Sequence, residues 1–237
     1  MRTENLSRLS GFNFTRFDTY YLHYKSFHQE LSKAIEIYAG GKLLDIGCGN
    51  KPYEKMFEGK ITDYKGCDIV QSDEKKVDII CEATNIPLPD ESFNTVFSTQ
   101  TIEHVADHQK LLNEAWRLLK PGGCIIVSGP MYWPLHEEPY DFFRFTKHGF
   151  KYILEKAGFE VVAINANGGA WASFGLSFMH VMNSKLPKRP FLIRAMKSIF
   201  FKLRLHWILN AVCEKFDRID FNPGNTINYV VVGQKKQ

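Results

Sequence analysis

A twelve-residue stretch, residues 135–146, concentrates side chains that could carry out acid–base chemistry. It contains one histidine, three acids, one arginine and four aromatic rings. The imidazole of His136 ordinarily titrates near neutrality, so it could take a proton from a hydroxyl group, and Asp141 could orient it. A structural role is also open, because Asp141 and Arg144 have the i,i+3 spacing of an ion pair and Thr146 could cap a following helix.

A second group of candidate residues lies in LLDIGCGN, residues 43–50. Gly47 and Gly49 follow an apolar run, and glycine lets a backbone pass close to a ligand and adopt positive φ. Asp68 comes 21 residues after Gly47. An acid at about this distance from a glycine loop binds ribose hydroxyls in nucleotide-binding folds. The spacing therefore predicts a nucleoside site.

The glycine loop differs from a dinucleotide fingerprint. That fingerprint has a third glycine near the pyrophosphate, where this chain has Pro52. Asp45, two residues before Gly47, would repel a pyrophosphate but could bind an ammonium group directly or through water. The loop thus favours a cofactor that carries both a nucleoside and an amino acid.

Alternating strand and helix patterns must position these residues. Apolar and β-branched runs predict strands at 42–47, 63–69, 77–81, 93–99, 124–129, 159–164 and 227–234. Helical patterns and end signals predict helices at 18–38, 52–59, 108–120 and 146–158, the third ended by Pro121-Gly122-Gly123. Apolar strands separated by helices predict a doubly wound α/β fold with a mostly parallel sheet, which binds ligands beyond the carboxyl ends of its strands.

Four ordered motifs resemble class I S-adenosylmethionine-dependent methyltransferases of the small-molecule branch. They are LLDIGCGN, the acid in GCDIV, EATNIPLPDESFNTVFSTQTIEHV and RLLKPGG. The resemblance runs from residue 42 to 166, roughly half of the chain. It implies a seven-stranded Rossmann-like sheet with an antiparallel last strand, 227–234, and S-adenosyl-L-methionine as the cofactor.

The resemblance also implies which residues bind the cofactor. By position, these are Asp45, Gly47 and Gly49 for the methionine part, Asp68 for the ribose, Glu82 and Ala83 for the adenine, and Thr99 and Gln100 beneath the sulfonium. The chain departs from the family at Glu82 and Asn94, where aspartate is usual, but Glu82 can still accept a hydrogen bond from the adenine amino group. Glu103 and His104 are expected to begin a helix that closes over the cofactor.

The stretch 135–146 follows the fifth predicted strand, so it should lie where the methyl group is presented. Its pattern resembles methyltransferases associated with polysaccharides and the cell envelope, with His136 one residue closer to Pro134 than in that pattern. This implies methyl transfer to a small molecule or a sugar hydroxyl, including one on a lipid-linked or polysaccharide precursor. His136, as base, and Asp141, as its orienting partner or as a ligand of sugar hydroxyls, are the predicted catalytic residues.

Composition narrows the class of protein. The chain has 237 residues, a net charge of +4, and five scattered cysteines without a C-x-x-C pair. This predicts a cytoplasmic protein with neither a disulfide framework nor a metal centre, and the mild charge does not indicate a nucleic-acid partner. Two alternatives stay open: a nucleic-acid methyltransferase, although the [D/N]-P-P-[F/Y] motif is replaced by Ser98-Thr99-Gln100-Thr101, and a non-catalytic binding protein with the same fold.

The sequence divides into three predicted parts. They are an N-terminal helical cap (1–41), a methyltransferase domain (42–169 and 226–237) and a helical insert or lid (170–225). Between residues 161 and 213 the chain has no acid and seven bases, and the i+4 row from Arg194 to Glu214 predicts one amphipathic helix with a narrow polar stripe. Its apolar face could pack on the domain, or the insert could rest peripherally on the anionic inner face of a membrane.

Overall fold

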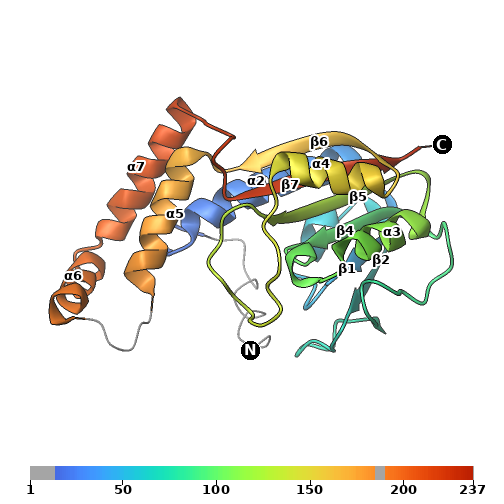
Figure 1. The fold of residues 1–237 in the computed structure, drawn as a ribbon, viewed down its shortest axis with the longest axis horizontal. Helices are drawn as coiled ribbons and strands as arrows, with labels where there is room; N and C mark the ends of the chain where they lie inside the picture. Colours follow the sequence, from blue (N-terminus) through green and yellow to red (C-terminus); the bar gives the residue numbers. More distant parts are fainter. Residues whose placement is uncertain (1–13, 185–189, 237) are drawn as a thin grey trace. The chain divides into compact units, whose positions relative to one another are not determined.

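The computed structural model describes residues 14–184 and 190–236. Within them, a seven-stranded sheet has the order β3-β2-β1-β4-β5-β7-β6 (Figure 1). Its strands are β1 (Gly41–Ile46), β2 (Ile61–Asp68), β3 (Ile79–Ile80), β4 (Phe93–Thr99), β5 (Leu119–Pro130), β6 (Phe159–Asn167) and β7 (Asn228–Lys235). β1 to β5 pair in parallel and β7 is antiparallel to β5. The predicted doubly wound sheet with an antiparallel last strand is confirmed.

The parallel strands end together at one edge of the sheet. Ile46 at the end of β1 pairs with Cys67 of β2, and Thr99 at the end of β4 pairs with Ser128 of β5. The segments that leave these strands therefore begin side by side, at the edge where folds of this type bind ligands.

Helices cover both faces of the sheet, as the alternating strand and helix pattern predicts. α3 (His108–Leu118) and α4 (Lys147–Lys156) lie side by side in front of the sheet in Figure 1, and the second half of α2 (Tyr21–Tyr38) lies behind it. The predicted inner face of α3 is fully buried, namely Leu111, Leu112, Ala115 and Leu118. Thr146 caps α4, because its hydroxyl accepts a hydrogen bond from the Gly149 amide at 3.0 Å.

Three local predictions were wrong in detail. The segment Pro121-Gly122-Gly123 does not follow a helix that runs to residue 120; α3 ends at Leu118, and these residues belong to β5. The short helix expected at 52–59 is a single 3-10 turn, η2 (Glu54–Phe57). Glu103 and His104 likewise lie in a 3-10 turn, η3 (Ile102–His104), that precedes α3.

The chain divides into two compact units. Among the described residues, the first unit holds 30–165 and 228–236, and the second holds 14–29, 166–184 and 190–227. The boundary in the N-terminal region therefore falls inside α2 rather than at the expected residue 41. The first unit contains most of the sheet and every predicted catalytic and cofactor-binding residue.

The second unit contains α5 (Ala170–Asn183), α6 (Phe191–Lys202) and α7 (Leu205–Ile219). The predicted single amphipathic helix is wrong, because Arg204 adopts φ of 55° and separates α6 from α7. None of the described helices is long and apolar enough to cross a membrane. Three of the seven predicted bases, Lys185, Lys188 and Arg189, lie outside the described residues.

The polar residues of α7 face inward within this unit. Glu214 is buried and forms ion pairs with Arg16, Lys25 and Arg218. Asn210 is also buried, and its amide donates to the carbonyl of Arg16 at 2.9 Å. The polar stripe that the sequence reveals on this helix is therefore its packed side.

Candidate active site

The glycine loop after β1 turns sharply toward β2. Gly47 has φ of +80° and Gly49 has φ of +49°. The amides of Gly47 and Cys48 both donate to the Cys67 carbonyl, at 2.9 and 3.1 Å. A Cβ on Gly47 would lie 2.2 Å from the Thr101 hydroxyl oxygen. Glycine is required here for its backbone conformation and because the segment after β4 packs directly against it.

Asp68, at the end of β2, holds this loop. Its carboxylate accepts hydrogen bonds from the Gly49 amide at 3.1 Å and the Ile69 amide at 2.7 Å. Asp68 thus braces the glycine loop from the end of β2, at the position where the spacing predicts an acid for ribose hydroxyls.

Asp45 is buried beneath the loop, with 3% of its surface exposed. The Tyr64 hydroxyl donates to its carboxylate at 2.6 Å. Burial raises the pKa of Asp45 to about 7, and the nearby negative charge of Asp68 adds to this, while the hydrogen bond from Tyr64 opposes it. A buried carboxyl in this state would gain from a cation, and an amino-acid ammonium is the cation that the sequence predicts.

The other predicted cofactor residues lie at the ends of β3 and β4. Glu82 and Ala83 follow β3, where the Cys81 amide donates to the Asp68 carbonyl at 2.9 Å. Thr99 ends β4, and Gln100 adopts φ of 50°, an uncommon backbone conformation that often marks a functional position. The predicted cofactor residues thus follow four adjacent strands along one edge.

The loop after β5 is held by a compact group of polar side chains. Arg144 forms a two-point contact with Asp141, whose side chain is 1% exposed, at 2.6 and 2.8 Å. Arg144 also donates to the carbonyls of Trp133 and Pro134. Burial alone would raise the pKa of Asp141, but hydrogen bonds from Arg144 and the His136 amide outweigh it and hold the pKa at about 2. Asp141 is therefore ionised at neutral pH.

His136 is bound to the same carboxylate. Its Nδ1 lies 3.2 Å from an Asp141 oxygen, and its backbone amide donates to that oxygen at 3.0 Å. Burial lowers the pKa of His136, and the neighbouring His104 lowers it further. The ion pair predicted between Asp141 and Arg144 is present, and the same carboxylate orients the imidazole. Asp141 thus both braces the loop through Arg144 and orients the ring of His136.

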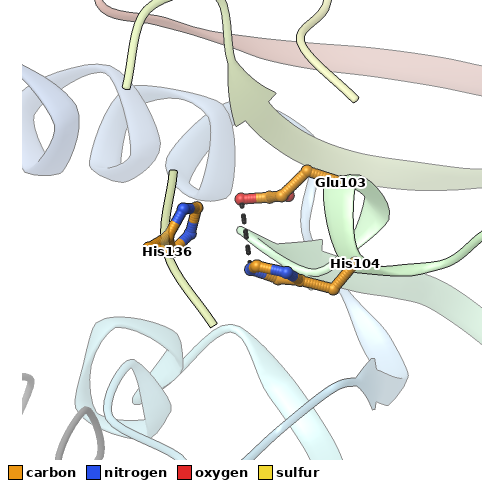
Figure 2. A group of neighbouring side chains, drawn as sticks. All are labelled: Glu103, His104 and His136. Atoms are coloured by element: carbon orange, nitrogen blue, oxygen red, sulfur yellow. Dashed lines mark ion pairs between the residues drawn. The ribbon is translucent and has the colours of Figure 1, made fainter. Parts of the chain in front are cut away.

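Glu103 and His104 also contribute to this group, which the sequence did not predict. Figure 2 shows their side chains beside His136, and the rings of His104 and His136 are 4.7 Å apart. Glu103 is fully buried, and burial raises its pKa to about 8. The loop is fastened to η3, because the Phe142 amide donates to the Glu103 carbonyl at 2.9 Å. In the sequence, the feature that could have pointed to these two residues was an acid–histidine pair soon after the end of a strand.

Residues 44–127 match a family model described as "Methyltransferase domain". The matched segment is similar to a methyltransferase domain; it begins just before the glycine loop, includes Asp68, Glu103 and His104, and ends within β5. The loop that carries His136 follows the matched segment.

Two curated relatives and one solved structure illustrate the similarity. The chain is 30% identical over 113 residues to 27-O-demethylrifamycin SV methyltransferase of Amycolatopsis mediterranei, covering 41% of this chain and 42% of that protein. It is 30% identical over 128 residues to demethylmenaquinone methyltransferase of Listeria monocytogenes, covering 46% of this chain and 54% of that protein. The chain thus spans about half the length of these relatives. A SAM-dependent methyltransferase structure from Archaeoglobus fulgidus aligns with TM-score 0.56 at 20% identity, over 89% of this chain and 94% of that one, and shows the same fold.

Proposed function

We propose that this protein transfers a methyl group from S-adenosylmethionine to an oxygen atom of a small molecule. One observation carries the proposal. Thr101 packs against Gly47 of the predicted cofactor loop, and two residues later Glu103 lies beside His136 of the predicted acceptor loop. Cofactor-binding and proton-accepting side chains are therefore brought to one place by the short segment after β4.

The residues at the glycine loop fit this cofactor. It would supply an activated methyl group on a positively charged sulfur. Asp45 offers a buried carboxyl that an ammonium group would stabilise in its ionised form, and Asp68 ends β2 beside the glycine loop, where an acid can bind ribose hydroxyls. Gly47 and Gly49 leave backbone room for the ligand.

The acceptor side fits a hydroxyl. Methyl transfer is an in-line displacement: the acceptor oxygen bonds to the methyl carbon, the carbon–sulfur bond breaks, and its electron pair stays on sulfur. The hydroxyl proton must leave at the same time. His136 can take it at Nε2, because its Nδ1 is bound to Asp141. The Amycolatopsis relative is likewise named as a methyltransferase of an O-demethyl compound.

For the acceptor class, we favour a sugar hydroxyl on a polysaccharide or lipid-linked precursor. The pattern around Pro134, His136 and Asp141 supports this choice, as does the surface of the second unit. There, α6 and α7 expose a series of large apolar side chains, namely Phe191, Leu192, Ile193, Met196, Ile199, Trp207, Ile208, Val212 and Ile219. Three exposed bases, Arg194, Lys202 and Arg204, lie among them.

This surface suits the interface of an anionic membrane. Apolar side chains enter the headgroup region, and bases bind anionic headgroups, each contributing about 1 kcal/mol. The segment 161–213 contains no acid that would oppose such binding, and the exposed Asp220 follows at the end of α7. Sedimentation with anionic and neutral vesicles tests the assignment: binding should require anionic lipid and weaken as salt is raised. Concentration-dependent self-association without vesicle binding would show instead that a second copy covers the surface.

The experiment for the proposed activity has two stages. Calorimetry first measures binding of S-adenosylhomocysteine, and a non-catalytic protein of this fold would fail at this stage. Transfer of a labelled methyl group is then measured on sugar hydroxyls, lipid-linked sugars and, as a contrast, nucleic acids. We expect His136→Gln to lower turnover while cofactor affinity and melting temperature stay nearly unchanged. Equal losses of stability and activity would leave only the bracing role for this residue, and labelling of nucleic acid alone would overturn the acceptor class.

A further inference from the structure

Three side chains beside the acceptor loop form a donor set that metal ions prefer. Glu103 and His104 come from η3 after β4, and His136 comes from the loop after β5. One carboxylate oxygen and one nitrogen from each imidazole all lie within 4.8 Å of one another (Figure 2). Two histidines and a carboxylate are a common ligand set for catalytic zinc and for other first-row transition metals.

Both imidazoles are oriented so that Nε2 is the available nitrogen. His104 Nδ1 lies 2.7 Å from the Tyr140 carbonyl, which can only accept a hydrogen bond. His136 Nδ1 lies 3.2 Å from an Asp141 carboxylate oxygen. Each Nδ1 therefore carries the hydrogen, and each Nε2 presents a lone pair. Metal-binding histidines are typically held this way by a carbonyl or a carboxylate.

The carboxylate of Glu103 lacks the partners that a buried charge needs. It is fully buried, and neither of its oxygens has a hydrogen-bond partner among the residues that the structure describes. His104 Nε2 lies 4.0 Å from the carboxylate, and as a neutral nitrogen with a lone pair it supplies no positive charge. A buried carboxylate is strongly unfavourable unless a cation or a proton compensates it.

We propose that Glu103, His104 and His136 bind a divalent transition-metal ion of the Zn²⁺ class. Donors at about 2.1 Å from a tetrahedral ion lie about 3.4 Å apart, so the three side chains must draw together by roughly an ångström. Three protein ligands leave a fourth position open, and the acceptor oxygen would fit there.

This inference rests on the proposed function for its purpose, because a metal-bound hydroxyl loses its proton more readily than a free one. A metal-bound His136 could not take the proton at Nε2, so the ion would replace the imidazole as the group that acts on the hydroxyl, and the proton would leave to solvent. Asp141 remains the residue that orients His136. The ion also supplies the positive charge that the buried Glu103 requires.

Metal binding is tested without cofactor or acceptor. The full chain is dialysed against a chelator and titrated with ZnCl₂ by calorimetry, and with CoCl₂ by visible absorption, which reports the ligand geometry. We expect one ion per chain. Glu103→Gln and His136→Gln should each weaken Zn²⁺ binding roughly 100-fold or more, because even removal of an orienting partner weakens binding about 10- to 100-fold. Asp141→Asn should fall in that smaller range.

Matched controls come from α4, where His148 and Glu155 are exposed. His148→Ala and Glu155→Gln should bind Zn²⁺ like the unaltered chain. If Glu103→Gln fails to fold, His136→Gln, in a side chain that is 26% exposed, provides the comparison. No saturable binding, or equal binding by these variants and the controls, would overturn the proposal and indicate that Glu103 is simply protonated. Methyl transfer by metal-free protein would reject the metal while leaving the proposed function intact.

Discussion

Replacing Asp45 by asparagine should stabilise the protein and weaken cofactor binding at the same time. Asparagine keeps the shape of the side chain and an oxygen that can accept the hydrogen bond from Tyr64. It removes the charge that burial disfavours, together with the charge that we assign to the cofactor's ammonium group. The two consequences have opposite signs, so no general loss of folding can imitate them.

The size of the stability effect follows from the pKa of Asp45, which burial raises from 3.8 to about 7. Between these values the folded protein holds a proton that the unfolded chain has released, so stability falls as pH rises through this window and then levels off. At about 1.4 kcal/mol per pH unit, the whole difference corresponds to roughly 4 kcal/mol, an upper bound. The variant lacks this loss, so its advantage should be small at pH 5 and largest above pH 7.

Urea unfolding at several pH values measures the first consequence, and calorimetry with S-adenosylhomocysteine at pH 8 measures the second. Loss of a charged hydrogen bond should weaken binding about ten- to a hundredfold. Asp63→Asn, at an exposed aspartate of the neighbouring strand β2, is the control and should change neither quantity. If Asp45→Asn is less stable than the unaltered chain at pH 8, the ionised carboxylate is stabilised by its surroundings and the reasoning is refuted.

Three further predictions concern the same edge and the acceptor loop. Asp68→Ala should weaken S-adenosylhomocysteine binding about ten- to a hundredfold by calorimetry; unchanged affinity would remove it from the ribose site. Gly47→Ala should lower the free energy of unfolding by roughly 2–4 kcal/mol, because backbone strain and a clash with Thr101 combine. As a control, Gly59 has a similar φ of +77° but open space around it, so Gly59→Ala should lower the free energy of unfolding by only about 1 kcal/mol. Thr146→Ala should lower stability by about 1 kcal/mol through loss of the cap, with little change in cofactor affinity.

The parts of the fold that follow from local pattern were predictable from sequence. β4 has the predicted limits, and Thr146 caps α4 as expected, because both depend on residues close together in the chain. The Pro121-Gly122-Gly123 segment was predicted only to end a helix, whereas these residues belong to strand β5. Pairing with β4 extends β5 back to Leu119, and such pairing depends on a partner about 25 residues away, which local pattern does not contain.

The candidate site was predictable where a motif specifies it and not where packing does. The glycine loop and Asp68 were identified from spacing, and the Asp141–Arg144 pair from its i,i+3 separation. The burial of Glu103 depends on the loop after β5, whose Phe142 amide binds the Glu103 carbonyl across 39 positions of sequence. The polar row of α7 was visible in the sequence, but the row alone could not show that Asn210 and Glu214 face inward.

The two buried acids at this edge of the sheet, Asp45 and Glu103, lie in similar surroundings. Asp45 lies two residues before Gly47, and Glu103 lies two residues after Thr101, which packs on Gly47. Each carboxyl is removed from water where no lysine or arginine among the described residues forms a direct ion pair with it. Such burial is unfavourable for folding alone. On our proposals, a ligand would bring the missing positive charge, an ammonium for Asp45 and a metal ion for Glu103, and binding would then offset the stability that the folded chain loses by burying the two carboxyls.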